Sequence, residues 1–121
     1  MPIIHVTVTK KLEREIKRDL QEYFVGQICN NTSTLSKNIY VYIHEMNPED
    51  CCKLAPTVLI NWTKQPDRTD SAKKEIMMAM TDKLAEICGF ELKDEIVITF
   101  NDVPLENAML GGETRLENPA K

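Results

Sequence analysis

The sequence has no long hydrophobic run, and no segment approaches the roughly eighteen apolar residues needed to cross a bilayer. The amino terminus also lacks the basic region, apolar stretch and cleavage site of a secretory signal. We therefore expect a cytoplasmic protein without a membrane partner. A basic patch is missing too, because the 15 Lys and Arg are interleaved with 19 Asp and Glu and the net charge is −4. This balance argues against nucleic acid as a partner.

Patterns of metal-binding residues are also missing. The four cysteines and two histidines follow none of the spacings typical of zinc sites. Cys51 and Cys52 are adjacent, and neighbouring cysteines rarely reach the geometry of a disulfide, so we expect reduced thiols. His5 and His44 fall on expected strands without a nearby set of ligands, which favours structural roles for both. The sequence thus predicts neither a metal site nor another cofactor.

The first half of the chain predicts a strand, a helix and a second strand. At 121 residues the whole chain has the length of one domain. Residues 3–9 alternate between apolar and polar, as a half-buried strand does. From Leu12 an apolar residue recurs at every fourth position, which indicates one face of a helix that ends near residue 30. Residues 38–46 are rich in β-branched and aromatic side chains, which favours a second strand.

The second half of the chain repeats this order of elements. Residues 57–63 have the composition of a strand. Thr69 or Asp70 is placed to cap a helix, and Gly89 is placed to end it. Residues 95–100 then predict a fourth strand.

The two halves look like one duplicated unit. Each opens with a proline, Pro2 or Pro56, and the two prolines lie 54 residues apart (56 − 2 = 54). A strand–helix–strand crossover joins parallel strands, so we expect an α+β fold with a four-stranded mixed sheet and two helices on one face. A single domain over residues 1–121 would contain repeats at about 2–55 and 56–113 and a short C-terminal tail. The same order of elements fits ferredoxin-like domains, so it leaves the function open.

Several segments carry motifs in a fixed order. They are MPIIHVTV at the start, NIYVYIHEMN at 38–47, DRTD at 67–70 and NDVPLENAMLGGE at 101–113. Together they resemble the tautomerase superfamily, whose 4-oxalocrotonate tautomerases are short strand–helix–strand chains that begin with a catalytic proline. The resemblance spans about residues 2–113 and points to a fused member with two units in one chain. It implies a tautomerase-like fold, a homotrimer, no cofactor and a small carboxylate as substrate.

A proline at position 2 suits that chemistry. Removal of Met1 would expose the imino nitrogen of Pro2, and an α-amino group has an ordinary pKa near 7.7 to 8.0. Burial and nearby Lys or Arg charges lower such a pKa towards neutrality, where a general base works best. Pro56 is held in a peptide bond and cannot act as a base. We therefore predict an isomerase, a keto–enol tautomerase, with Pro2 as its catalytic base and acid.

The resemblance also implies cationic residues that hold the substrate carboxylate. Arg68 matches the arginine of the family's Gly-Arg-Ser-Asp motif, while Lys10 and Lys11, at the end of the first strand, are secondary candidates. Tyr40 stands in place of a second arginine of the family, and its hydroxyl can hydrogen-bond an enolate. Because that arginine is missing, two alternatives stay open. One is a catalytically weak or inactive tautomerase-like binding or assembly module, and the other is a ferredoxin-like ligand-binding domain.

Overall fold

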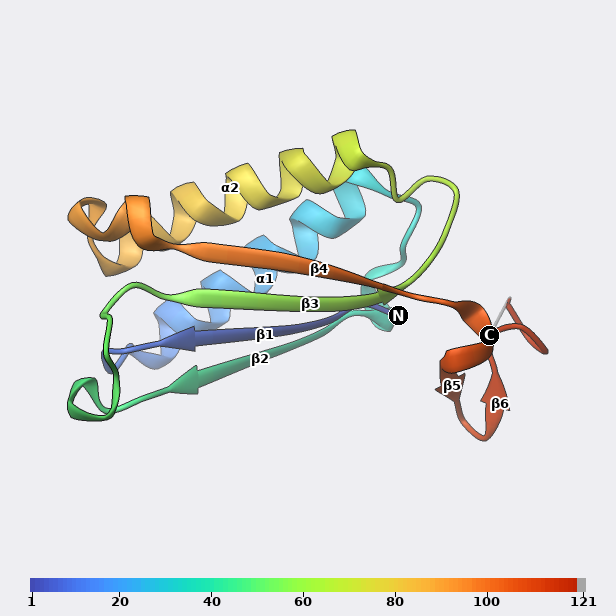
Figure 1. The fold of residues 1–121 in the computed structure, drawn as a ribbon, viewed down its shortest axis with the longest axis horizontal. Helices are drawn as coiled ribbons and strands as arrows, with labels where there is room; N and C mark the ends of the chain where they lie inside the picture. Colours follow the sequence, from blue (N-terminus) through green and yellow to red (C-terminus); the bar gives the residue numbers. More distant parts are fainter. Residues whose placement is uncertain (120–121) are drawn as a thin grey trace.

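Four strands form one sheet in the computed structural model, which describes residues 1–119, and two long helices cover one face of that sheet (Figure 1). The strands are β1 (Ile3–Val8), β2 (Tyr40–Glu45), β3 (Thr57–Thr63) and β4 (Val97–Val103), and the long helices are α1 (Arg14–Asn31) and α2 (Asp70–Cys88). Short 3-10 helices and a hairpin complete the fold: Ser36–Asn38, Pro48–Asp50, Phe90–Glu95, Leu105–Asn107, β5 (Met109–Leu110) and β6 (Glu113–Thr114). The predicted fold class is confirmed. No helix within the described residues is long and apolar enough to cross a membrane.

The sheet is mixed, with the strand order β2-β1-β3-β4. The β1–β2 and β3–β4 pairs are parallel, whereas the central pair, β1 and β3, is antiparallel. The central pair aligns His5 with Leu59, and these residues are separated by the same 54 positions as Pro2 and Pro56 (59 − 5 = 54). An approximate two-fold axis between His5 and Leu59 therefore relates the two strand–helix–strand units. As a result, Pro2 lies where β3 ends, and Pro56 lies where β1 ends.

The core lies between the sheet and the helices. Alternate residues of the central strands face the helices, because successive side chains of a strand point to opposite faces. The fully buried side chains come from β1, β3, α1 and α2: Ile4, Val6, Val8, Val58, Ile60, Trp62, Leu20, Phe24, Ile28, Ile76, Met80 and Leu84. The hydroxyl of Thr69 caps α2 by accepting a hydrogen bond from the Ala72 nitrogen at 3.1 Å.

The hairpin near the carboxyl end turns through two glycines. Gly111 and Gly112 have φ angles of 61° and 88°, which glycine adopts at low cost. The nitrogen of Arg115 then donates a hydrogen bond to the carbonyl oxygen of Ala108 at 2.8 Å. Figure 1 shows the hairpin at the same end of the sheet as the amino terminus. Residues far apart in the sequence therefore meet at this end.

Candidate active site

The amino terminus is partly buried at the beginning of β1. Pro2 is buried, and its carbonyl oxygen accepts a hydrogen bond from the Tyr40 nitrogen at 2.9 Å. The pKa of the Met1 amino group is lowered from 8.0 to about 5, chiefly by burial and in addition by the charges of Arg68 and Arg115. An amine at this end of the sheet is therefore mostly neutral at neutral pH, and a neutral amine can accept a proton.

Arg68, in the loop between β3 and α2, is held in place by its neighbours. Its guanidinium donates hydrogen bonds to the carbonyl oxygen and the hydroxyl of Thr63 and, at 3.0 Å, to the hydroxyl of Thr34. Its Cζ also lies 4.8 Å from the centre of the Trp62 ring. Burial lowers the pKa of Arg68, while the charge of Asp67 raises it, and a guanidinium stays charged at neutral pH. These contacts fix a positive charge near the amino terminus.

Arg115 is a candidate that the sequence analysis missed. Its residue surface is 7% exposed, and its guanidinium donates a hydrogen bond to the carbonyl oxygen of Pro119 at 2.9 Å. The positive charge of Arg115 is one cause of the lowered pKa of the Met1 amino group. Arg115 belongs to none of the motifs. The one available signal was that an arginine lies two residues after the expected closing hairpin.

Met1 lines two small cavities. One has a volume of about 190 Å³ and is bordered by apolar side chains that include Ile3 and Ala108. The other has a volume of about 230 Å³ and is bordered by Arg68, Arg115, the carboxylate of Asp67 and several uncharged residues. An amine at this point therefore has apolar space on one side and a cavity with two cations and one carboxylate on the other.

Tyr40 lies next to this amino terminus at the beginning of β2. It pairs with Ile3 of β1, and 41% of its surface is exposed. Its side chain lies on the face of the sheet that the helices leave open, because exposed and half-buried residues alternate along β2. The structure thus brings Pro2, Arg68 and Tyr40 to one end of the sheet, and the role of Tyr40 stays a prediction.

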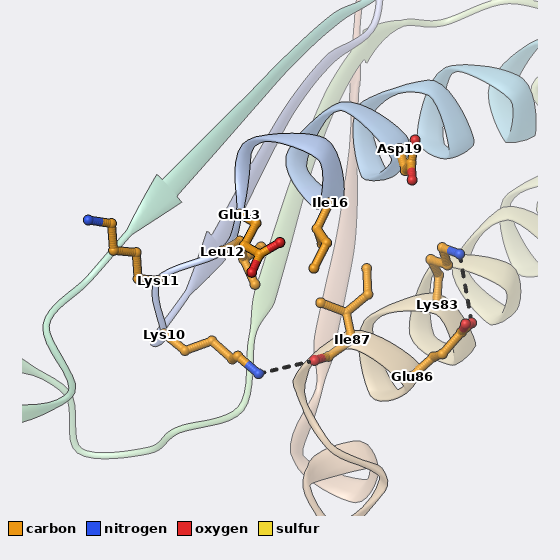
Figure 2. Close-up of a pocket in the computed structure, with 9 residues that line it drawn as sticks. All are labelled: Lys10, Lys11, Leu12, Glu13, Ile16, Asp19, Lys83, Glu86 and Ile87. Atoms are coloured by element: carbon orange, nitrogen blue, oxygen red, sulfur yellow. Dashed lines mark hydrogen bonds and ion pairs between the residues drawn. The ribbon is translucent and has the colours of Figure 1, made fainter.

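Lys10 and Lys11 lie at the opposite end of β1. A strand of six residues spans about 20 Å, so neither lysine is beside Pro2 of the same chain. Figure 2 shows both lysines at a cavity of about 510 Å³ between the beginning of α1 and the end of α2. The Nζ of Lys10 donates a hydrogen bond to the carbonyl oxygen of Ile87 at 3.3 Å, whereas Lys11 points away from it. The antiparallel central strands place Pro56 beside the end of β1, so the lysines lie near Pro56 rather than near Pro2.

The arrangement at the amino terminus suits proton transfer on an anionic substrate. A neutral amine can take a proton and return it, and two arginines can bind a carboxylate and stabilise the negative charge of an enolate. Within residues 1–119, no group of three or more His, Cys, Asp or Glu is placed to hold a metal ion.

Comparisons with known proteins link the chain to one family. Residues 56–115 match the family model described as "Tautomerase enzyme". No curated protein has a sequence similar enough to match this chain.

Solved structures share the fold over almost the whole chain. A structure of native fused 4-OT is 15% identical with a TM-score of 0.77, and the match covers 97% of this chain and 98% of that one. A symmetric trimer described as Q0 fused 4-OT is 13% identical with a TM-score of 0.78, and the match covers 95% and 97% of the two chains. Pt0534, solved after inactivation by 2-oxo-3-pentynoate, is 18% identical with a TM-score of 0.75, and the match covers 93% and 95%. At these identities the matches establish a shared fold.

Proposed function

We propose that this chain, which belongs to the tautomerase superfamily, is a cofactor-independent isomerase of small enol or keto carboxylic acids. Pro2, freed by removal of Met1, is its general base and acid. The observation that carries the proposal is the amino terminus itself, which is partly buried near two arginines and whose amine has a pKa lowered to about 5. The nitrogen of a processed Pro2 would lie one residue further along the chain, and Pro2 is buried in the structure, in which Met1 is still present.

The proposed reaction moves one proton. The lone pair of the neutral Pro2 nitrogen takes the proton from the enol hydroxyl, and the oxygen keeps the bonding electrons as an enolate. The enolate then forms its carbonyl double bond, and the carbon of the former C=C bond takes a proton from the Pro2 ammonium. This step restores the neutral amine, so no other reactant is consumed.

The two arginines would supply the binding of the acid. Arg68 and Arg115 border the same cavity, and their two positive charges outnumber the single negative charge of Asp67, which also borders it, so the cavity favours a substrate carboxylate. The buried Nε of Arg68 has no hydrogen-bond partner within residues 1–119, and a bound carboxylate would provide one. Removal of Met1 would add the space of its side chain to this cavity and to the apolar one beside it. Tyr40, at the same end of the sheet, is a candidate hydrogen-bond donor to the enolate.

We also propose a homotrimer. Fused 4-OT structures of this fold are described as trimers, and one face of the present sheet is uncovered. Sheet faces and edges that a small domain leaves open are commonly covered by neighbouring chains. Sedimentation that finds only a 13.9 kDa monomer at micromolar concentration would exclude this assembly.

The decisive experiment compares three forms of the amino terminus. Mass spectrometry first establishes that Met1 is absent, and ketonisation of 2-hydroxymuconate-type and phenylenolpyruvate-type enols is then measured. A variant with one extra residue before Pro2 has an amide nitrogen in place of the amine, so we expect its activity to be lost. Pro2→Ala keeps a primary amine that is differently placed, and its turnover should fall about a hundred- to ten-thousand-fold. Circular dichroism serves as the control that both variants keep the fold.

If the extended variant is as active as the processed protein, Pro2 is not the base. If no form ketonises any of the enols, the chain is better explained as a tautomerase-like binding or assembly module. The feature that favours this second candidate is the presence of Tyr40 and Val97 where the family resemblance places an arginine.

A further inference from the structure

The face of the sheet that the helices leave open has a distinctive composition. Its largest exposed side chains are aromatic or aliphatic: Tyr40, Tyr42, Leu59 and Val97 are between 41% and 53% exposed. Within the four strands the only residues with a fixed charge are Glu45 and Asp102. Both face the helices, where Glu45 pairs with Lys17 and Asp102 pairs with Lys73. The open face of the strands therefore carries no fixed charge, although 28% of the residues of this protein are charged.

Such a surface fits a second copy of this chain. The buried centres of protein interfaces are depleted of charge and enriched in tyrosine, as this face is. Fused 4-OT structures with the same fold are described as trimers, and in the proposed homotrimer a neighbouring protomer would cover this face. The face also adjoins the candidate active site, because Ile3 and Asn61 lie on it and border the apolar cavity beside Met1.

The two histidines of the chain lie together on this face. The Nδ1 of His5 and the Nε2 of His44 are 2.9 Å apart, and the two rings are stacked with centroids 5.1 Å apart. The Tyr42 ring also stacks with the His5 ring, with centroids 5.2 Å apart. A hydrogen bond between two ring nitrogens needs one donor and one acceptor, so at most one of the two imidazoles can carry a second proton. Two protonated rings would instead turn N–H towards N–H and place two positive charges in contact.

No side chain of the four strands offsets those charges. The neighbours of the pair on the open face are Tyr42 on β2, Thr7 on β1 and Leu59 on β3, and the only other titratable side chain of the strands there is Tyr40. No carboxylate of the four strands faces the pair, because Glu45 and Asp102 lie on the helix side. Burying an unpaired charge in an apolar interface is costly.

We infer that the His5–His44 pair makes the assembly of this chain through its open sheet face dependent on pH. The trimer forms while at most one imidazole of the pair is protonated, and it dissociates when both are. The inference rests on the proposed homotrimer, and it assigns to the two histidines a regulatory role rather than a structural one. Because the apolar cavity at Met1 shares residues with this face, dissociation would also uncover one side of the candidate active site.

Sedimentation velocity of the full chain between pH 8 and pH 5 tests the inference. We expect a trimer at pH 8 and its dissociation at lower pH, because acid favours the protonation of both rings, which the hydrogen bond between them does not allow. The dissociation concentration should rise about tenfold per pH unit for each proton taken up. The double variant His5→Gln/His44→Gln keeps polar side chains without a titratable ring, so it should remain a trimer throughout. Each single variant has only one imidazole and can never carry both protons, so it should also remain a trimer. Circular dichroism of the wild-type chain at pH 5 excludes unfolding as the cause of its dissociation.

A wild-type trimer that persists at pH 5 would overturn the inference and leave the homotrimer intact. A double variant that dissociates like the wild type would overturn it as well, because other groups would then be responsible. A monomer at every pH would instead refute the proposed homotrimer. If the double variant does not fold, the wild-type imidazole signals in NMR decide the question, since the inference requires them to titrate at the pH where the trimer dissociates.

Discussion

At the level of single residues, the pH at which the Pro2 nitrogen becomes neutral decides when the proposed base can act. Burial and the charges of Arg68 and Arg115 hold the pKa of the amine at this terminus below its ordinary 8.0. A lowered pKa means that the neutral form is already present below pH 8. We therefore expect kcat/KM of the processed enzyme to rise with pH through a pKa below about 7.7 and to be level at neutral pH. A rising limb at pH 8 or above would contradict this expectation.

The two arginines should affect both substrate binding and the pH at which kcat/KM rises. Loss of a charged hydrogen bond to the substrate costs about 1.5 to 3 kcal/mol, so Arg68→Ala and Arg115→Ala should lower kcat/KM by about ten- to a hundredfold. Each substitution also removes a positive charge near the amine, which raises the pKa of the amine. The rise of kcat/KM with pH should therefore move to higher pH.

Matched variants separate these effects from general damage. Arg115→Lys keeps the charge, so kcat/KM should rise at the same pH as in the wild-type chain. Arg14 is exposed at the start of α1, and Arg14→Ala should change neither kcat/KM nor the pH at which it rises. Lys10→Ala should cost less than Arg68→Ala. If kcat/KM rises at the same pH in Arg68→Ala, in Arg115→Ala and in the wild-type chain, the two charges do not lower the pKa of the base.

The site residues differ in how far the sequence alone identifies them. Pro2 and Arg68 belong to local motifs, so the sequence alone identifies them as candidates. The structure brings them to one end of the sheet. The sequence does not identify Arg115 as a site residue, because its position near the amino terminus depends on how the hairpin turns at Gly111 and Gly112. Lys10 was placed by analogy between the two units, but it follows β1 and so lies at the opposite end of that strand from Pro2. The sequence does not reveal that the antiparallel central strands bring Arg68, after β3, to the Pro2 end.

At the level of the elements, periodicity identified the main strands and helices, because burial on one side dictates the spacing of apolar residues. The strand expected at 57–63 has these bounds in the structure. The fourth strand begins at Val97, later than expected, because Phe90–Glu95 forms a 3-10 helix. Such short helices have no period long enough to recognise. The sequence of β1 or β3 also does not show that the two strands are antiparallel, because the alternation of apolar and polar residues reads the same in both directions.

The two long helices begin differently, and this gives a test of stability. Thr69 caps α2 through its hydroxyl, whereas Glu13, at the corresponding position before α1, makes no such side-chain hydrogen bond. Thr69→Ala should therefore lower the free energy of unfolding by about 1 kcal/mol, and Glu13→Ala should leave it nearly unchanged. Urea denaturation at one fixed protomer concentration measures both, because dissociation also contributes to the stability of an oligomer. Equal effects of the two substitutions would contradict the assigned cap.

At the level of the whole molecule, the two units are related by an approximate two-fold axis, yet they are chemically unequal. Pro2 and Pro56 occupy corresponding positions and both are buried, but only Pro2 can have a free nitrogen. The 510 Å³ cavity at the Pro56 end is larger than either cavity at Met1, but its amines are those of lysine side chains and it has no free α-amino group. Cavity size therefore does not identify the reactive end of this molecule; the free amine and its charged surroundings do.

This inequality predicts the outcome of covalent labelling. Pt0534 was solved after inactivation by 2-oxo-3-pentynoate, so we expect the same compound to attach once per chain here, at the nitrogen of Pro2. The rate of labelling should be proportional to the fraction of the amine that is neutral. It should therefore rise with pH over the same range as kcat/KM. Peptide mapping by mass spectrometry locates the label, and the chain with an extra residue before Pro2 is the control that should stay unlabelled. A label on any of the four cysteines, or one that persists in the extended chain, would show that the reactive nucleophile lies elsewhere.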